Sequence, residues 1–309
     1  MFLTVTLNPA LDKTLVVENN HPQTTLRATE AVDLAGGKGV NVARALLALG
    51  GRVRACMPLG GHPGQQVADL ARLEGMEVAP LPVAGQTRTA LTIRDRASGC
   101  YWHYLEPGPR FEERELTRIR EGFLWALDGC HTVAISGSLP SPAAAPLLPW
   151  MVRVAREQGL RVALDSFPPG RRAALEAGPW LAKPNREEAE AALGLPVTTE
   201  EDGWRVLEQM ASFGIGFPLL TLGADGALAL IEGERYRIGA PEVVEVNDLG
   251  SGDAMLAGIC WAAAEGRPTP EVLAWGAACG AANASVWDPG GIERAAVERL
   301  LPRVHIITV

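Results

Sequence analysis

The chain has 309 residues, of which 47% are hydrophobic and 21% are charged, and its formal net charge is −8 at pH 7. This length and composition are typical of a globular protein with an ample core, and we expect one domain over residues 1–309. The acidic balance argues against a nucleic-acid-binding surface, although a few local arginines can still bind an anionic substrate. Residues 1–9 show no signal-peptide pattern, and no apolar run reaches the length of a membrane span. We therefore expect no membrane partner and a cytoplasmic location.

The cysteines and lysines are informative by their placement. The five cysteines are scattered and mostly flanked by apolar residues, which predicts reduced core thiols, with neither a disulfide framework nor a zinc site. The lysines are Lys13, Lys38 and Lys183, and arginine provides the other basic side chains. We expect the lysines to mark positions where a compact ammonium group cannot be replaced by a planar guanidinium. Chance retention is the alternative.

Short strands predict a small sheet that leaves the main one. Residues 2–7 are apolar and β-branched, as in a strand, and the segment 13–34 follows with two more strand-like runs and no helix between them. The segment 88–105 adds two runs that are joined by a hairpin-like turn. Because a few strands alone are marginally stable, a homodimer through this sheet would cover its apolar face.

Two glycine-rich turns each precede a predicted helix. Gly36-Gly37-Lys38-Gly39 leads into the first helix, which carries Asn41 in its first turn. Close packing of the helix on a sheet would also explain these glycines. Gly250-Ser251-Gly252 leads into the second helix, and Asp253 follows it at once. Neither turn is a dinucleotide fingerprint or a GxxxxGK[ST] loop.

The turn before Asp253 is the stronger candidate for chemistry. A helix start leaves amide groups unpaired and carries the positive end of the helix dipole, so it can bind an anion. An aspartate there repels an anion, but it suits the deprotonation of a hydroxyl that attacks a phosphoryl group held by the amides. A simple N-cap is the bland alternative.

From residue 112 onward, apolar strands alternate with helices, which predicts a parallel sheet covered on both faces. Asn185 and Glu188 are three residues apart at one helix start. Their oxygens suit Mg²⁺ or a water of its shell, and the same spacing suits a capping box. The pattern alone favours the cap.

The motifs in this order resemble the PfkB (ribokinase-like) family of sugar kinases, and within it the hexose-phosphate branch. They are TVTLNPALD, AGGKGVNVARALLALG, TR, ISGSLP, KPNREE, TLGADGA and GSGDAMLAG, at residues 4–12, 35–50, 87–88, 135–140, 183–188, 221–227 and 250–258. The resemblance implies an α/β fold with a central, mostly parallel sheet flanked by helices. It also implies a small β-sheet lid from about residues 13–34 and 88–105, and often a dimer through the lids.

The resemblance further implies ATP with Mg²⁺ as the phosphoryl donor. Asp253 would be the catalytic base, and Gly250, Ser251 and Gly252 would supply anion-hole amides. The magnesium shell would include Asn185 and Glu188, which reverses the preference for a cap. The residues implied for sugar hydroxyls are Asp12, Gly37, Asn41 and Ser138, and those implied for nucleotide are Lys183, Asn185, Thr221, Gly223, Gly226 and Asn283.

The acceptor's own phosphate requires further basic groups, and Lys38, Arg88 and Arg27 can form such a cluster. Arg27 is either a contact across a dimer or an ordinary surface residue. The resemblance implies a 1-phosphofructokinase activity first, which converts fructose 1-phosphate to fructose 1,6-bisphosphate. Tagatose-6-phosphate kinase and 6-phosphofructokinase activities are alternatives, and a non-catalytic sugar-phosphate sensor is an alternative from another class. The departures from the family pattern at Ala90, Asp248 and Ser251 leave the acceptor open.

Overall fold

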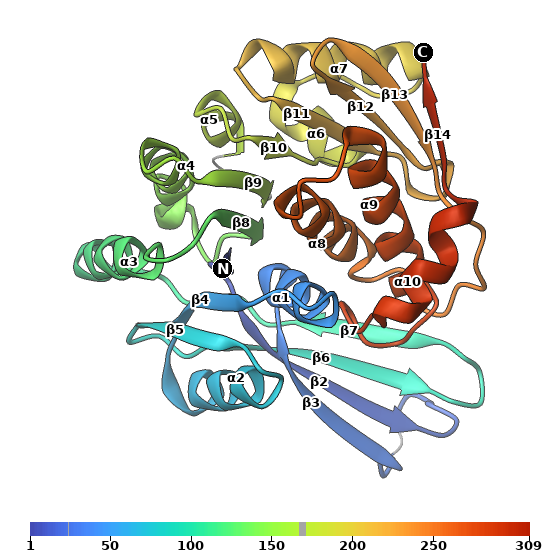
Figure 1. Cartoon of the computed structure of the whole chain (residues 1–309). Helices are drawn as coiled ribbons and strands as arrows, with labels where there is room; N and C mark the ends of the chain where they lie inside the picture. The colour runs from blue at the N-terminus through green and yellow to red at the C-terminus, as the bar shows by residue number, and fades with distance from the viewer. Residues whose placement is uncertain (24, 167–170) are drawn as a thin grey trace.

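The computed structural model describes residues 1–23, 25–166 and 171–309, and these residues form two sheets (Figure 1). The large sheet has the order β14-β13-β12-β11-β10-β9-β8-β1-β4-β5. Its strands from β5 to β11 run parallel, and β12, β13 and β14 continue it in antiparallel fashion. The strands are β1 (Phe2–Val5), β4 (Val53–Leu59), β5 (Glu77–Pro82), β8 (Thr132–Gly137), β9 (Arg161–Ser166), β10 (Leu181–Ala182), β11 (Phe217–Thr221), β12 (Ala227–Ile231), β13 (Glu234–Gly239) and β14 (His305–Thr308).

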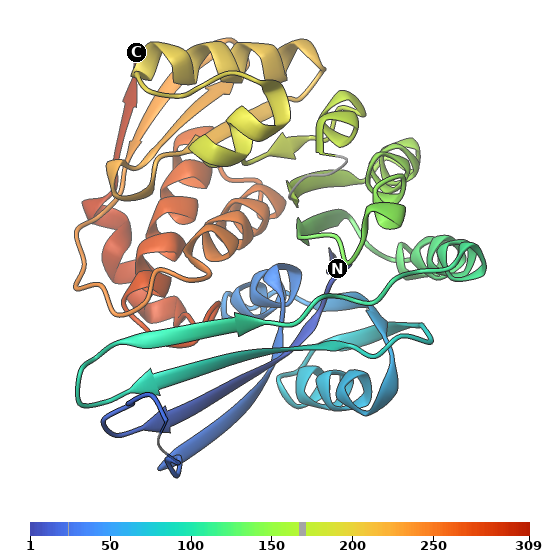
Figure 2. The same cartoon turned by 180° about the vertical axis from the view of Figure 1, so that it is seen from behind.

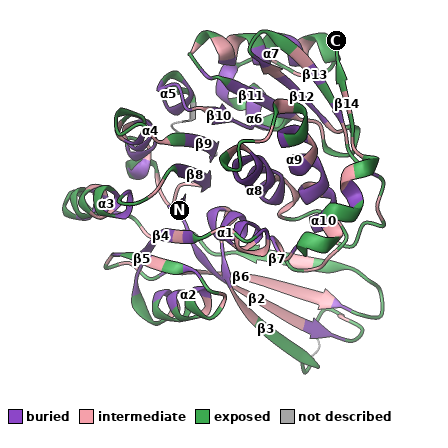
Figure 3. Ribbon diagram, in the orientation of Figure 1, coloured by how far each residue is buried: buried purple, intermediate pink, exposed green. Residues whose placement is uncertain are grey.

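Helices cover both faces of the large sheet, because each face carries its own apolar cluster. One face packs against α1 (Lys38–Ala48), α2 (Gly61–Leu73), α8 (Ser251–Ala264), α9 (Thr269–Ala284) and α10 (Arg294–Leu300). The other packs against α3 (Glu113–Ala126), α4 (Leu147–Glu157), α5 (Arg171–Glu176), α6 (Arg186–Leu193) and α7 (Glu200–Ser212). Short 3₁₀ turns lie at η1 (Pro142–Ala144), η2 (Gly223–Asp225) and η3 (Leu301–Arg303). In Figure 3, α8 and α9 lie in the buried interior.

The small sheet has the order β3-β2-β6-β7 and extends away from the large sheet, as the views from both sides show (Figures 1 and 2). Its strands are β2 (Ala10–Val17), β3 (Glu30–Gly36), β6 (Arg88–Asp95) and β7 (Tyr101–Leu105). The two central strands, β2 and β6, run parallel with Ala10 opposite Arg88 and Asp12 opposite Ala90. Since side chains alternate along a strand, Asp12 and Arg88 lie on one face of the small sheet.

The predicted fold class is confirmed: a large, mostly parallel sheet lies between helices, and a smaller sheet is separate from it. The bounds of the small sheet differ from the expected segment 13–34, because β2 begins at Ala10 and β3 ends at Gly36. The pairing of β2 with β6 holds Ala10, Leu11 and Asp12 in extended form. The helices α7 and α10 and the strand β14 were not predicted from the sequence.

The direction in which strands are added to the large sheet reverses at β1. Along the chain, β4 and β5 are added on one side of β1, and β8, β9, β10 and β11 on the other. In open α/β sheets, ligands bind where the order reverses, at the carboxyl ends of the strands. The segments that follow β1, β8, β9, β10 and β11 therefore meet at one edge of the sheet.

The part of the chain that the structure describes has no helix both long and apolar enough to span a bilayer. The five cysteines, all within this part, are unpaired thiols.

Candidate active site

The glycine-rich turn before α8 forms a tight helix start. Gly250 is the N-cap with φ of 85°, a left-handed conformation that favours glycine, and α8 begins at Ser251. A Cβ on Gly252 would lie 3.1 Å from Nζ of Lys183, so glycine lets the ammonium group approach the backbone. The amide of Ser251, one of the three expected at the anion with those of Gly250 and Gly252, instead donates to the carbonyl of Asp248 (3.1 Å). By position, the amides of Gly252 and Asp253 are those that the helix start leaves for an anion.

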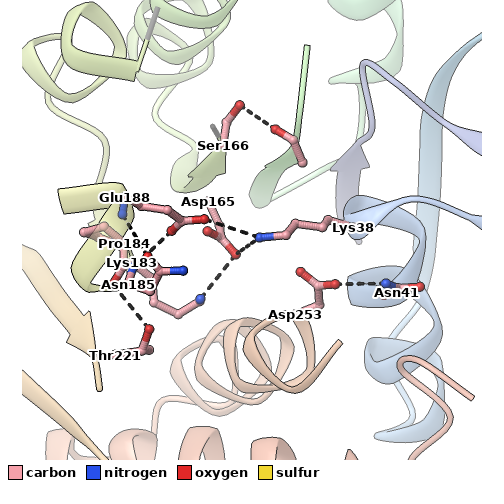
Figure 4. A network of polar contacts seen from close by, with 11 residues as sticks. Lys38, Asn41, Asp165, Ser166, Lys183, Pro184, Asn185, Glu188, Thr221 and Asp253 are labelled. Atoms are coloured by element: carbon pink, nitrogen blue, oxygen red, sulfur yellow. Dashed lines mark hydrogen bonds and ion pairs between the residues drawn. The ribbon is translucent and has the colours of Figure 1, made fainter. Parts of the chain in front are cut away.

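Asp253 is buried, with 2% of its surface exposed. Its Oδ2 accepts a hydrogen bond of 2.9 Å from Nδ2 of Asn41 on α1, whereas its buried Oδ1 has no hydrogen-bond partner among the described residues (Figure 4). Burial raises the pKa of this carboxyl to about 7; Asp165 raises it further, and Lys38, the Asn41 hydrogen bond and Lys183 act in the opposite direction. A carboxylate with this pKa and one unused oxygen can accept a proton near neutral pH.

Two lysines and two further carboxylates form a network next to this aspartate (Figure 4). Lys183 Nζ lies 3.2 Å from Asp165 Oδ2, and Lys38 Nζ lies 3.9 Å from the same oxygen and 3.6 Å from Glu188 Oε1. Asp165, Lys183 and Glu188 are all buried. Two of the three lysines thus lie in the site, and Lys13 pairs with Asp33 on the small sheet (3.2 Å).

Asp165 is a site residue that was not predicted from the sequence. It is the next-to-last residue of β9, so it lies at the carboxyl end of a parallel strand. An aspartate after the apolar residues 162–164 of this strand was a usable signal, but its lysine partners are far away in the sequence. Ser166 beside it donates to the carbonyl of Gly137 (2.7 Å), which ties β9 to the end of β8.

Asn185 and Glu188 form the capping box that their spacing allows. Asn185 Oδ1 accepts from the Glu188 amide (2.8 Å), and Glu188 Oε2 accepts from the Asn185 amide (3.0 Å). The second carboxylate oxygen of Glu188 faces Lys38. The cap and a magnesium-shell position are therefore compatible for Glu188. No cluster of three or more His, Cys, Asp or Glu side chains suited to a metal occurs in the described part of the chain.

The acceptor-side residues gather where β1 meets the small sheet. Arg88 donates from Nη2 to the carbonyl of Asn8 (3.3 Å), and Asn8 Nδ2 donates to Ser138 Oγ (3.0 Å). A Cβ on Gly36 would lie 2.1 Å from Cγ of Asp12, so the Asp12 carboxylate occupies the space above this glycine. Burial raises the pKa of Asp12 to about 6, while Arg44 and Arg88 lower it. Gly37 is the N-cap of α1, beside them.

The basic side chains expected at the acceptor's phosphate have different partners in the structure. Lys38 faces Asp165 and Glu188, whereas Arg88 lies at Asn8, and desolvation lowers the pKa of its guanidinium while Asp12 raises it. Arg27 is exposed in the connection between β2 and β3.

The residues expected at a nucleotide follow β10 and β11. Thr221 ends β11, and its amide donates to the carbonyl of Pro184 (3.0 Å). Gly223 and Gly226 bound the turn that follows it. Asn283 differs from the expectation, since it is completely buried and its amide is used within the protein. It donates to Leu249 O and Ser251 Oγ and accepts from the Gly290 amide (2.9, 3.2 and 2.6 Å), a pattern that supports the turn from behind.

A buried carboxylate and two lysines at a helix start, at the edge of a parallel sheet, are typical of enzymes that transfer phosphoryl groups. The model of the pfkB family carbohydrate kinases matches residues 6–291. The chain belongs to this family and is a sugar-phosphate kinase.

The relatives are kinases of hexose phosphates. The chain is 32% identical to ATP-dependent 6-phosphofructokinase isozyme 2 of Escherichia coli over 281 residues. This aligned region covers 90% of this chain and 91% of the relative. It is 29% identical over 312 residues to tagatose-6-phosphate kinase of Staphylococcus epidermidis, over the full length of both. Among solved structures, E. coli phosphofructokinase-2 in complex with potassium superposes with a TM-score of 0.91 at 29% identity, covering 97% of this chain and 98% of the other. A possible 1-phosphofructokinase from Thermotoga maritima gives 0.90 at 25% identity, covering 100% and 99%.

Proposed function

We propose that this protein transfers the terminal phosphoryl group of ATP to a hydroxyl of a ketohexose phosphate, with fructose 1-phosphate as the first acceptor to test. The observation that carries the proposal is the environment of the Asp253 carboxylate. Its Oδ1 is buried without a described partner, its Oδ2 is held by Asn41, and it stands in the first turn of α8. An aspartate that only caps a helix does not have to be buried. Burial that raises the pKa of Asp253 to about 7 is typical of functional sites.

In this proposal, Asp253 Oδ1 removes the proton from the acceptor hydroxyl as its oxygen bonds to phosphorus. The bond from phosphorus to the bridging oxygen breaks, and ADP leaves with that electron pair. The amides of Gly252 and Asp253 and the ammonium group of Lys183 stabilise the negative charge on the transferred group. Asp12 and Asn41 orient the sugar, so that little covalent work is left to the protein.

The site also fits a magnesium ion. Mg²⁺ usually keeps several waters and is bound through one or two carboxylates together with substrate phosphates. Glu188 and Asp165 are buried carboxylates beside two lysines, and Asn185 lies at the same helix start. These three residues would hold the ion through its water shell. When bound, it neutralises charge on the phosphate oxygens. Lys183, Thr221, Gly223 and Gly226 would contact the nucleotide.

The second part of the proposal is the identity of the acceptor sugar. The resemblance of the motifs puts fructose 1-phosphate first, and the similarity to the possible 1-phosphofructokinase of T. maritima is consistent with it. Fructose 6-phosphate and tagatose 6-phosphate are the second candidates, because the E. coli and S. epidermidis relatives are named for kinases of these sugars. All three acceptors carry a phosphate that Arg88 could bind, and Ser138, which like Arg88 contacts Asn8, would lie near the sugar. A non-catalytic sensor would not require the buried carboxylate of Asp253.

An ADP-release assay with Mg²⁺ and ATP tests the proposal. The panel comprises fructose 1-phosphate, fructose 6-phosphate, tagatose 6-phosphate and unphosphorylated fructose. We expect turnover with at least one phosphosugar and much less with fructose. Release that never exceeds the rate without sugar would contradict the kinase proposal, and a preference for fructose would contradict the assignment of a phosphosugar acceptor.

A second copy of the chain is the proposed protein partner, and we regard residues 1–309 as one kinase unit with the small sheet inserted in it. The face of the small sheet opposite Asp12 and Arg88 carries Leu91, Ile93, Trp102 and Tyr104, which the register places side by side. Tyr104 is 56% exposed. In Figure 3 the strands of the small sheet are mainly half-buried or exposed. Pairing of two such faces would cover this apolar surface.

A further inference from the structure

Arg44 lies on α1 one turn after Asn41, and none of the roles above includes it. Its side chain is 14% exposed, and its Nε and Nη2 donate to the two carboxylate oxygens of Glu74, at 2.5 and 3.0 Å. Nη2 also donates to the carbonyl of Ala35 (2.7 Å), and Nη1 donates to the carbonyl of Pro289 (2.6 Å). One guanidinium group thus joins α1 to the end of α2, to β3 and to the turn that follows α9.

The remaining bond of this group reaches the catalytic centre. Nη1 of Arg44 donates to Oδ1 of Asn41 (3.2 Å). An arginine has five N–H donors and no acceptor, so the atom of Asn41 that faces it must be the oxygen. The NH₂ group of the same amide then points to Asp253, where it donates to Oδ2 (2.9 Å).

The opposite orientation of this amide is disfavoured twice. A flipped Asn41 would place its NH₂ group against the donors of Arg44 and its oxygen against the carboxylate of Asp253. Arg44 is itself held by its bonds to Glu74, Ala35 and Pro289, so it cannot turn away to relieve the clash. The arrangement leaves Asp253 Oδ2 always occupied and Oδ1 as the oxygen that meets the acceptor.

A second connection leads from Arg44 to the same helix start. Gly290 follows Pro289, and a Cβ on it would lie 2.4 Å from the carbonyl oxygen of Asn41, so the turn packs directly on α1. The Gly290 amide donates to Asn283, which in turn donates to Leu249 O and Ser251 Oγ at the start of α8.

We propose that Arg44 is a positioning residue for phosphoryl transfer: it fixes the amide of Asn41 so that Asp253 presents a single defined oxygen to the acceptor hydroxyl. This inference rests on the proposed function. The charged groups that face Asp253 are Lys38 from α1, Asp165 from β9 and Lys183 after β10. Arg44 also lowers the pKa of Asp12 on the acceptor side, so the test must include a readout of the protonation of Asp253 itself.

The test compares Arg44→Met with Glu74→Gln, which weakens the outer ion pair but keeps the contact between Arg44 and Asn41. Loss of a hydrogen bond to a carboxylate favours its protonated form. In Arg44→Met, we therefore expect the acid limb of the kcat/KM profile to move to higher pH by about one unit, and kcat to fall roughly ten-fold. The KM for ATP stays within about two-fold of the parent value. Arg44→Lys, which retains the charge and can still pair with Glu74, should shift the limb in the same direction if Arg44→Met does not fold.

In Glu74→Gln, the acid limb should coincide with that of the parent enzyme even where thermal stability falls. In an Asn41→Ala background, Arg44→Met should shift the limb no further. A merely structural role would leave the limb of the Arg44 variants unmoved or shift that of Glu74→Gln equally, and either result would overturn the inference.

A second readout needs no turnover. The ¹³Cγ resonance of Asp253, identified by its loss in Asp253→Asn, reports the protonation of this carboxyl directly. A higher midpoint in Arg44→Met without any phosphosugar turnover would support the positioning role and refute the proposed function. Turnover together with an unchanged midpoint would refute the positioning role alone.

Discussion

At the scale of single residues, the site depends on a carboxylate whose two oxygens have different surroundings. Asp253 Oδ2 is bonded to Asn41, and Oδ1 has no partner in the described part of the chain. An unsatisfied buried oxygen costs stability, and such costs are concentrated at functional sites. Asp12 on the acceptor side shows the same tendency, with a pKa raised to about 6.

This cost gives a stability prediction. Because the folded state raises the pKa of Asp253 from 3.8 to about 7, it binds more protons than the unfolded state between these values. The contribution of Asp253 to the free energy of unfolding therefore falls by a few kcal/mol as the pH rises from about 4 to 7. Asp253→Asn should thus raise the melting temperature by several degrees at pH 8 and by less at pH 5. The matched control is Asp248→Asn, an exposed neighbour. Equal changes at the two pH values would show that the carboxyl titrates normally.

Some of the residues around Asp253 could be predicted from the sequence. Because lysine is scarce in this sequence, Lys38 and Lys183 stood out as candidates. In the structure, both ammonium groups lie among buried carboxylates. Asp165 and Arg44 were not selected, since their partners are brought together only by the fold. The spacing of Asn185 and Glu188 predicted the capping box directly, because that contact is local.

At the scale of elements, the alternation of strands and helices predicted the large sheet, because apolar periodicity is a local property. The missed α7 carried a usable signal, since Thr199 and Asp202 form a capping box before the buried Trp204 and Leu207. The extent of β2 could not be read locally, because it is set by pairing with β6, more than 70 residues away. The parallel pairing also brings Asp12 and Arg88 to one face.

The small sheet should affect the acceptor more than ATP. Arg88 is largely withdrawn from water at the start of β6, and its Nε has no hydrogen-bond partner among the described residues, so it can bind the acceptor's phosphate. We expect Arg88→Ala to raise the KM for the phosphosugar roughly 10- to 100-fold and the KM for ATP less than two-fold. Steady-state kinetics with each substrate varied in turn measures both constants.

The matched control is Arg94→Ala, on the same strand and the same face. Arg94 stacks on Trp287, 4.1 Å from the ring centroid, and so contacts the chain after α9. Its loss should leave the acceptor KM within a few-fold of the parent value. If both variants raise the two KM values equally, Arg88 does not read the acceptor.

At the scale of the whole molecule, the small sheet has one face toward the site and an apolar face away from it. We expect the protein to sediment as a homodimer at micromolar concentration. Tyr104→Glu should place a charge in the middle of the pairing surface and give a monomer. Trp125→Glu, at an aromatic residue of α3 that is 65% exposed, is the control that should leave the dimer intact. Analytical ultracentrifugation distinguishes these outcomes, and a monomeric parent protein would contradict the proposed partner.

The central claim is that Asp253 accepts the proton of the acceptor hydroxyl. The most direct measurement is kcat of Asp253→Asn with the phosphosugar that the parent enzyme prefers, under saturating ATP and Mg²⁺. An asparagine retains the size of the side chain and can still accept the bond from Asn41, but it cannot take a proton. We predict a fall in kcat of about 10²- to 10⁴-fold with a small change in the acceptor KM. An unchanged kcat in a folded variant would contradict it.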